Sequence, residues 1–500
     1  NLMVGGEIQN SITTKYTKYE SAGMPGSFYE YDESARENPD VNAVQIDRDG
    51  DEIYRFVSAF TRLKYSIKDK YFLEATGRVD GSSRFGTNNK YGFFPSLSGG
   101  WVMSEENFLK NNKVINFMKL RGSWGVSGNA NIPNYESWGT VIPANFNPYY
   151  NGQPIIYPNR LANPNLKWER SNVYDISLQM GLWEDRVTME VSAYYKDTRD
   201  VLMKLTVPSS SGFNDYWDNV GRITNQGVEF ELKSVNISKK KFTWSTNFNI
   251  AHNQNEIKSI GDYSEDAVSG GTNDTRVVVG EPVGTNYLVK FSHVDSENGR
   301  PVYLDLEGNE TYEWLPNNRV PVGNILPKAV GGLTNTFKLD NWDFSFLLYY
   351  SFGSKIYDSS SKRQLGVVTD WNMRDDIYDR WQQPGDDATY PRLTLNTQTY
   401  GSGTPWINTD LWLHSGDYVR LRNVTLGYTF NGFKFLKRQF TDLRVACIAT
   451  NWLTWTTFPG LDPEIGRDFE NSTDRNMSPN ITYLTPPQEK SIVITINAKF

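Results

Sequence analysis

The sequence predicts an all-β fold: a transmembrane antiparallel β-barrel of the outer membrane, with about fourteen strands in the 500 residues. Three observations predict it. Apolar and polar residues alternate in many segments. These segments run to about 10 to 14 residues, which suits a tilted bilayer crossing of ~9 to 11 residues better than the ~5 to 6 of globular strands. Finally, every second connection between them is short.

The composition permits a barrel and excludes other classes. Aromatic residues make up 14% of the chain, with 29 Tyr and 15 Trp, and membrane barrels place such residues at both membrane interfaces. No segment approaches the ~18 consecutive apolar residues of a membrane helix. The net charge of -7 offers no basic patch for nucleic acid, and a single cysteine excludes an internal disulfide.

Strands are assigned where side chains of one kind recur at every second position. In "KYFLEATGRVDG", an apolar set with Tyr71, Leu73 and Val79 alternates with a set containing Glu74 and Arg78. The same alternation occurs in "RVTMEVSAYYK", "FTWSTNFNIAHN" and "WDFSFLLYYSF". The predicted strands, in chain order, are 2–10, 53–67, 71–80, 91–103, 118–127, 171–183, 186–198, 222–235, 241–258, 330–339, 342–352, 416–430, 441–453 and 490–500.

The connections alternate in length along the chain. The short set is 68–70, 184–186, 236–241 and 340–341, with two longer members at 104–117 and 431–440. The long set is 11–52, 128–170, 199–221, 259–329, 354–415 and 454–489, with only 81–90 compact. A soluble sandwich has no reason to sort its loops in this way. An outer-membrane barrel does, because it has short periplasmic turns and long extracellular loops.

The last predicted strand places Ile492, Ile494 and Ile496 on one face, toward lipid, where a Lys at mid-depth would cost ~2 to 4 kcal/mol. Phe500 would lie at the periplasmic interface, and such a terminal aromatic residue resembles the signal read by the bacterial barrel-assembly machinery. Open sheet edges leave backbone groups unsatisfied in lipid. Either these strands close on themselves, or further N-terminal strands complete a larger barrel. The start at "NLMVGGEIQN", without an initiator Met or signal peptide, favours the second alternative.

Several long motifs resemble one family, the SusC/RagA-like TonB-dependent transporters of Bacteroidetes outer membranes. They occur in order over nearly the whole chain. The motifs are "KYFLEATGRVDGSSRFGTNNKYGFFPSLSGGWVMSEENF", "LRGSWGVSGN", "NPNLKWE", "VPSSSGFNDYWDNVGRITNQGVEFEL", "RWQQPGDDATYPRL", "YVRLRNVTLGYTF" and "NWLTWTTFPGLDPEIG".

The resemblance implies a barrel of twenty-two strands with an N-terminal plug, of which residues 1–500 would be the C-terminal part. The plug, the TonB box and the first strands would lie outside these residues, so energy coupling rests on analogy alone. The implied function is TonB-dependent nutrient import of oligosaccharides or peptides. A second hypothesis is that the barrel serves as a structural scaffold subunit of a larger outer-membrane assembly or secretion complex. An intact TonB box upstream would favour transport, and a degenerate one would favour the scaffold.

The resemblance also implies partners. A SusD-like surface lipoprotein would form a lid over the extracellular mouth, and TonB would act through the missing N-terminal region. Surface lipoproteins that process glycans or peptides would accompany the pair, and the barrel would sit in outer-membrane lipid. A dimer of transporter and lid pairs fits the same resemblance.

No catalytic arrangement is found in the sequence, so the chain is predicted not to be an enzyme and to need no cofactor. There is no G-x-S-x-G elbow and no G-x-x-x-x-G-K-[ST] loop. The three histidines, His252, His293 and His414, lack ligand-like spacing. "DRDGDE" places Asp47, Asp49 and Asp51 around a glycine and faintly resembles a calcium loop, but the twelve-residue pattern is incomplete, so a hydrophilic extracellular turn is the favoured explanation.

Two further groups are candidate site residues. Arg78, Asp80 and Arg84 place charges of both signs at the outer end of a strand. They predict an ion-pair network that faces the lumen or supports the first outer loop, or, alternatively, contact with the plug during gating.

Aromatic residues in the outer loops are the other group, because sugars stack on aromatic faces. Ligand contact is predicted for Tyr216, Trp217 and Trp371. Packing of the long loops against one another is the alternative reading.

Overall fold

The computed structural model describes residues 1–22, 42–143, 149–150, 153–154, 156–268, 275–365, 372–393, 408–435, 438–464, 481–482 and 486–499. Two predicted functional residues, Trp371 and Phe500, lie outside these residues. Within the described ranges, no helix is long and apolar enough to cross a membrane.

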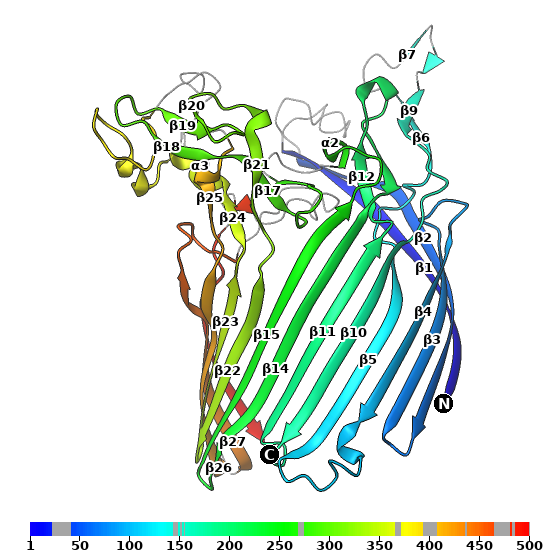
Figure 1. The fold of residues 1–500 in the computed structure, drawn as a ribbon, viewed down its shortest axis with the longest axis vertical. Helices are drawn as coiled ribbons and strands as arrows, with labels where there is room; N and C mark the ends of the chain where they lie inside the picture. Colours follow the sequence, from blue (N-terminus) through cyan, green and yellow to red (C-terminus); the bar gives the residue numbers. More distant parts are fainter. Residues whose placement is uncertain are drawn as a thin grey trace.

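One antiparallel sheet of fourteen strands, here called the membrane wall, contains all fourteen predicted strands, and its strand order follows the chain (Figure 1). Its strands are β1 (Leu2–Ala22), β2 (Asn42–Ile67), β3 (Tyr71–Ser82), β4 (Tyr91–Val102), β5 (Ile115–Asn129), β10 (Glu169–Leu182), β11 (Val187–Arg199), β14 (Arg222–Ser238), β15 (Phe242–Ser259), β22 (Ala329–Leu339), β23 (Trp342–Phe352), β26 (Tyr418–Phe435), β27 (Arg438–Thr456) and β29 (Ser491–Lys499).

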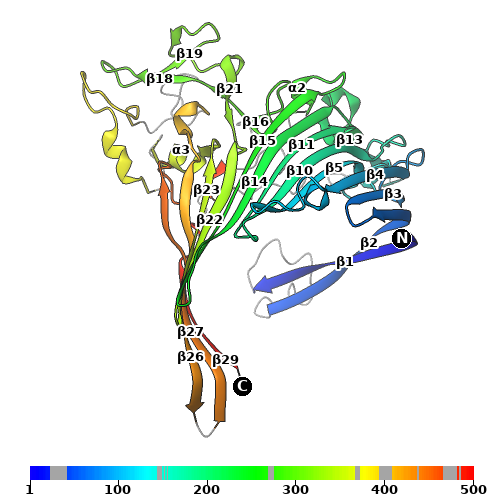
Figure 2. The ribbon, with the colours of Figure 1, turned by 60° about the horizontal axis from the view of Figure 1, so that its bottom comes forward.

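The sheet that forms the membrane wall is strongly curved, as Figure 2 shows. Its two edge strands are β1 and β29, and in the described residues neither pairs with the other. The predicted all-β barrel fold is therefore confirmed as a partial barrel.

The two faces of the membrane wall differ in chemistry, as the alternation predicts. On the outer face, Ile176, Ala193 and Val228 lie opposite one another on β10, β11 and β14, and Ile176 is 55% exposed. The other face, here called the luminal face, carries polar pairs. Arg62 Nε lies 2.5 Å from Glu74 Oε1 across β2 and β3. The apolar side chains thus meet lipid, while the charged ones pair inside.

Tight turns with positive φ join the strands at the periplasmic end. Lys68 and Asp69, between β2 and β3, have φ of 50° and 54°, and the two-residue hairpin turns that match strand twist need positive φ. The turn between β10 and β11 also has positive φ, at Trp183, Glu184 and Asp185.

Two predicted connections are shorter than expected. The predicted loop 11–52 is largely strand, because β1 continues to Ala22 and β2 begins at Asn42. The predicted connection 431–440 is also mostly strand, since β26 ends at Phe435 and β27 begins at Arg438. Backbone hydrogen bonds hold these extensions together, so no apolar alternation is needed to form them. The sequence pattern therefore misses them.

The segments between the outer strand ends form a second layer, here called the extracellular cap (Figure 1). Its elements are β6 (Thr140–Pro143), β7 (Tyr149–Tyr150), β8 (Gln153–Pro154), β9 (Ile156–Arg160), β12 (Leu202–Thr206), β13 (Asp215–Asn219), α2 (Glu265–Val268), β16 (Thr275–Arg276), β17 (Thr285–Val289), β18 (Phe291–Val294), β19 (Pro301–Leu304), β20 (Glu310–Thr311), β21 (Arg319–Asn324), β24 (Lys355–Asp358), α3 (Ser359–Leu365), β25 (Leu413–Ser415) and β28 (Ile481–Thr482), with short 3-10 turns between them.

Candidate functional site

The β12–β13 hairpin lies between two hydrophobic clusters in the cap. Leu205 pairs with Tyr216, and Lys204 pairs with Trp217. Because neighbouring residues in a strand point to opposite faces, Tyr216 packs against one cluster while Trp217 belongs to the other. The hairpin is therefore fixed from both sides.

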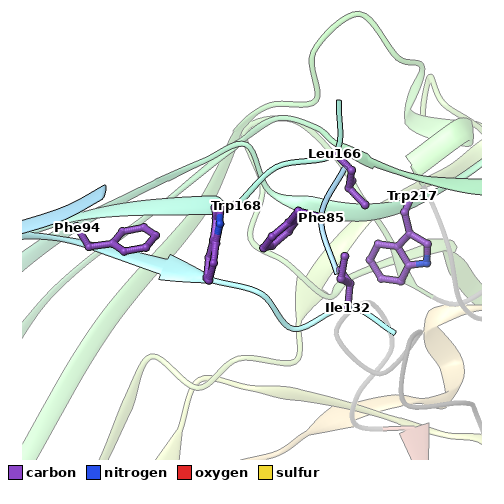
Figure 3. Close-up of a cluster of buried hydrophobic side chains, with 6 residues drawn as sticks. All are labelled: Phe85, Phe94, Ile132, Leu166, Trp168 and Trp217. Carbon is purple, nitrogen blue, oxygen red and sulfur yellow. The ribbon is translucent and has the colours of Figure 1, made fainter. Parts of the chain in front are cut away.

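The first cluster surrounds Trp168, whose ring lies 4.8 Å from that of Phe85 and 5.3 Å from that of Phe94 (Figure 3). Trp168 Nε1 donates a hydrogen bond to the carbonyl of Lys90 at 3.0 Å, so its polar atom is satisfied. The buried members come from three loops and strand β4: Phe85, Phe94, Ile132, Leu166, Trp168 and Trp217.

Three polar side chains linked by hydrogen bonds lie at the edge of the second cluster. Tyr263 donates a hydrogen bond to Asp218 Oδ2 at 2.8 Å, and its oxygen lies 2.7 Å from that of Tyr216. The hydrogen bond between the two phenols, burial and the Asp218 carboxylate together raise the pKa of Tyr263. The buried apolar members are Leu205, Val220, Ile257, Ile260, Val268 and Val277.

A cavity of about 970 Å³ lies between the clusters and the outer ends of β11, β14 and β15. Its lining mixes aliphatic side chains with charged ones. The charged lining residues are Glu52, Arg84, Glu136, Arg160, Glu169, Lys196 and Lys204. A cavity of this size and mixed chemistry can hold a small polar ligand with apolar parts.

Two charged groups in the cavity differ in their surroundings. Glu136 Oε1 lies 3.2 Å from Arg160 Nη2. Burial nevertheless raises the pKa of Glu136, against the attraction of Arg160 and Lys204. In the described part of the chain, no carboxylate lies within ion-pair distance of Lys196. Lys196 is therefore the cation that is best placed to meet an anionic group of a ligand.

Arg78 and Asp80 form a close pair on the luminal face. Arg78 Nε lies 2.7 Å from Asp80 Oδ1, and Arg78 Nη2 donates to Ser58 Oγ at 2.9 Å. Arg84 has different partners: its guanidinium donates to Asn134 Oδ1 at 2.9 Å and lies 4.1 Å from the ring centre of Tyr54. The three residues therefore fall into two groups. The Arg78–Asp80 pair makes contacts between wall strands, whereas Arg84 connects the loop after β3 to the loop that contains Asn134.

The structure brings Tyr216 and Trp217 to the cavity region but in different roles. Trp217 lines the cavity and is only 7% exposed, while Tyr216 packs in the second cluster. The hydrophilic turn predicted at Asp47, Asp49 and Asp51 is wrong, because this stretch is extended backbone in β2, where Asp47 and Asp51 pair with β1. The register with β1 shifts at Asp49, which is the extra residue of a β-bulge in the otherwise paired stretch. No cluster of three potential metal ligands occurs among the described residues.

Sequence reasoning missed Glu136, Lys196 and Tyr263. Lys196 was placed in a strand, but its neighbours across the lumen depend on the fold. Glu136 and Tyr263 lie in loops with no local motif. Two motifs lie nearby: "NPNLKWE", which contains Trp168, and "VPSSSGFNDYWDNVGRITNQGVEFEL", which contains Trp217.

Comparison with known proteins gives consistent matches. The family described as "TonB dependent receptor-like, beta-barrel" matches residues 1–448. TonB-dependent receptor P26 of Formosa agariphila is 30% identical over 515 residues, which cover 99% of this chain and 51% of that protein. TonB-dependent receptor SusC of Bacteroides thetaiotaomicron is 32% identical over 430 residues, which cover 82% of this chain and 41% of that protein. The chain spans about half the length of the curated relatives it matches.

Solved structures show the same fold. The structure of the RagAB peptide transporter matches with a TM-score of 0.78 at 21% identity, covering 92% of this chain and 49% of that chain. The RagAB peptide importer in its closed-closed state matches with a TM-score of 0.73 at 20% identity, covering 99% of this chain and 54% of that chain. The family is one of transport receptors, which agrees with the prediction that the chain is not an enzyme. The chain therefore belongs to the TonB-dependent receptor-like β-barrel family, is similar to SusC and RagA, and lies in the outer membrane.

Proposed function

We propose that this chain is the C-terminal barrel portion of an outer-membrane nutrient importer that takes up oligosaccharides or peptides. The observation that carries the proposal is the cavity of about 970 Å³ at the extracellular mouth of a barrel from this family. A cavity of this size, with aliphatic and charged lining, can hold one segment of such a ligand.

The proposed mechanism has three stages. A ligand is captured at the mouth, occluded under a SusD-like lipoprotein lid, and released into the periplasm after TonB displaces the plug. The relationship to the RagAB peptide importer and to SusC supports this sequence of events. Within it, we propose that Trp217 and Lys196 contact the ligand in the cavity, with Tyr216 and Trp371 as further contacts.

The proposal includes the missing part of the barrel. Both edges of the wall, β1 and β29, would need partners in lipid, where unpaired backbone groups cost several kcal/mol each. Further strands in a twenty-two-stranded barrel would supply them, and an N-terminal plug would fill the lumen. Arg78 and Asp80 face that lumen, so we propose that they contact the plug during gating. Unchanged uptake by an Arg78→Ala variant that assembles normally would refute this role.

Uptake by cells that express the full-length protein tests the function. Lys196→Glu reverses the free charge in the cavity, and we expect uptake of the native nutrient to fall at least tenfold because an anionic group would be repelled. Lys239→Glu in an exposed periplasmic turn is the matched control. Equal uptake by the two variants would show that the nutrient does not pass through this cavity.

Purification through a tag on the full-length protein separates the two functional hypotheses. A lid-sized lipoprotein at a one-to-one ratio is the expected result for an importer. A fixed set of assembly or secretion proteins would instead support the scaffold function.

A further inference from the structure

A row of three arginines crosses the outer ends of β10, β11 and β14. Arg170 lies directly opposite Arg199, and Arg199 lies directly opposite Arg222. Residues that face each other in antiparallel strands project from the same face of the sheet. The side chains of Arg199 and Arg222 are 58% and 41% exposed, and Arg170 is also exposed. The row is therefore open to its surroundings.

This face of the wall is the one that meets lipid. Moving from the middle of the membrane outward, successive rows on these three strands become more polar. The rows are Ile176–Ala193–Val228, then Tyr174–Tyr195–Gln226, then Asn172–Asp197–Thr224, and finally Arg170–Arg199–Arg222.

The tyrosine row marks the membrane interface. The rings of Tyr174 and Tyr195 lie 6.5 Å apart, and Tyr174 is 50% exposed. Aromatic residues of this kind gather at the level of the lipid headgroups. The arginine row is two rows further out, which corresponds to roughly 10 Å of depth for a tilted strand. Long arginine side chains at this height reach the headgroup layer.

Positive charge exceeds negative charge around the arginine row. Asp197 accepts hydrogen bonds from Arg222 Nε at 2.6 Å and from Arg199 Nε at 2.9 Å. On the neighbouring strand, Lys258 and Glu256 neutralise each other at 2.7 Å. In the described part of the chain, no carboxylate lies within ion-pair distance of Arg170. One buried carboxylate thus pairs with two of the three guanidinium groups, and an excess of positive charge remains.

We propose that the arginine row binds the phosphate groups of an anionic glycolipid in the outer leaflet of the membrane. The planar guanidinium forms paired hydrogen bonds with phosphate oxygens. Asp197 holds Arg199 and Arg222 with their side chains side by side, so the row is ordered before a lipid arrives. This site lies on the outside of the wall, away from the cavity, and is independent of the transport function proposed above.

A double variant tests the site without exposing a buried charge. Arg170→Gln together with Arg199→Gln removes two cations, while Arg222 keeps both of its hydrogen bonds to Asp197. The full-length protein is placed in nanodiscs that contain lipid A-type phosphorylated glycolipid, and the bound glycolipid is counted by native mass spectrometry. Retained glycolipid should fall roughly tenfold in the double variant, because each cation near an anionic lipid surface adds to binding.

Three controls make the result decisive. Lys239→Gln with Lys240→Gln removes the same charge at the periplasmic end and should retain glycolipid as the wild type does. Dephosphorylated glycolipid should be retained weakly by every variant, and free inorganic phosphate should not displace the bound lipid. Heat-modified migration in detergent gels confirms that each variant forms a barrel.

Equal retention of the phosphorylated glycolipid by the double variant and the wild type would overturn the proposal. Equal retention of the dephosphorylated lipid by the wild type would also overturn it, since the headgroup phosphate would then play no part. Efficient displacement by free phosphate would reassign the row to a soluble phosphate site.

Discussion

Large apolar side chains are exposed on the outer face of the membrane wall but buried in the extracellular cap. In the wall, Ile494 is 71% exposed and Ile8 is 85% exposed. In the cap, Leu166 and Leu288 are fully buried. Apolar side chains in this chain are therefore placed for two different solvents. Lipid covers the outer face of the wall, whereas the cap must remove its apolar groups from water.

The two regions therefore depend on different forces. Wall strands are held by backbone hydrogen bonds that cannot be exchanged for water in the bilayer. Cap loops are held by side-chain packing, as around Trp168 and in a third cluster of Leu288, Tyr357, Leu365, Ile377 and Trp412. Packing defects should damage the cap, and misplaced charges should damage the wall.

The largest effect is expected from Trp168→Ala in the cap. The variant loses a buried indole and its hydrogen bond to Lys90, so we expect the loops around the first cluster to lose ~3–5 kcal/mol of local stability. Hydrogen exchange of residues 83–90 measures the change. Trp138→Ala is the control, because Trp138 is 58% exposed. Equal exchange in the two variants would show that packing does not hold the cap.

The converse change is Leu178→Lys in the wall. Leu178 lies on the lipid-facing side of β10, opposite Val191, and a Lys at mid-depth costs ~2–4 kcal/mol. We expect less assembled protein in the outer membrane. Gln179→Lys on the same strand points to the lumen beside Glu190 and should assemble normally. Similar yields would mean that the faces are wrongly assigned.

A smaller loss of stability is expected when a side chain is added to a tightly packed glycine on the luminal side of the wall. A Cβ at Gly227 would lie 2.6 Å from Tyr194 Cζ and closer still to the carbonyl oxygen of His252, so Gly227→Ala should cost ~1–3 kcal/mol through overpacking. At Gly122, which lies on the lipid-facing side opposite Ile176, the nearest atom would be 3.9 Å away, so Gly122→Ala is the control without overpacking. Unfolding in urea from lipid vesicles compares the two, and the ranking fails if Gly122→Ala is the weaker protein.

The smallest effect concerns the pH dependence of the cap. Burial raises the pKa of Glu136 in the folded state. Its protonated form is thus favoured by folding, and the stabilisation is complete below the ordinary carboxyl pKa and is lost as pH rises through the raised value. Hydrogen exchange around Glu136 should become faster over that window. Glu136→Gln should remove the trend, and a trend that persists would assign it to another group.

The fold was largely predictable, because alternation with period two reports which residues face lipid. All fourteen wall strands were predicted in the right order, with β23 at the predicted residues 342–352. The extensions of β1 and β2 were not predictable, since polar strands outside the membrane need no apolar pattern. The sequence prediction named Trp217 and Arg84, which line the cavity, but not Glu136 and Lys196, which line it with them.

Local periodicity and connection length were enough to predict the strands, their order and the lipid-facing side. The three-dimensional fold was needed to show which loops share a hydrophobic cluster, that Glu136 and Lys196 line one cavity, and that Arg170, Arg199 and Arg222 form a row. The physical reason is register. Strand pairing brings residues from distant segments to one level of the sheet, and no local pattern encodes that level.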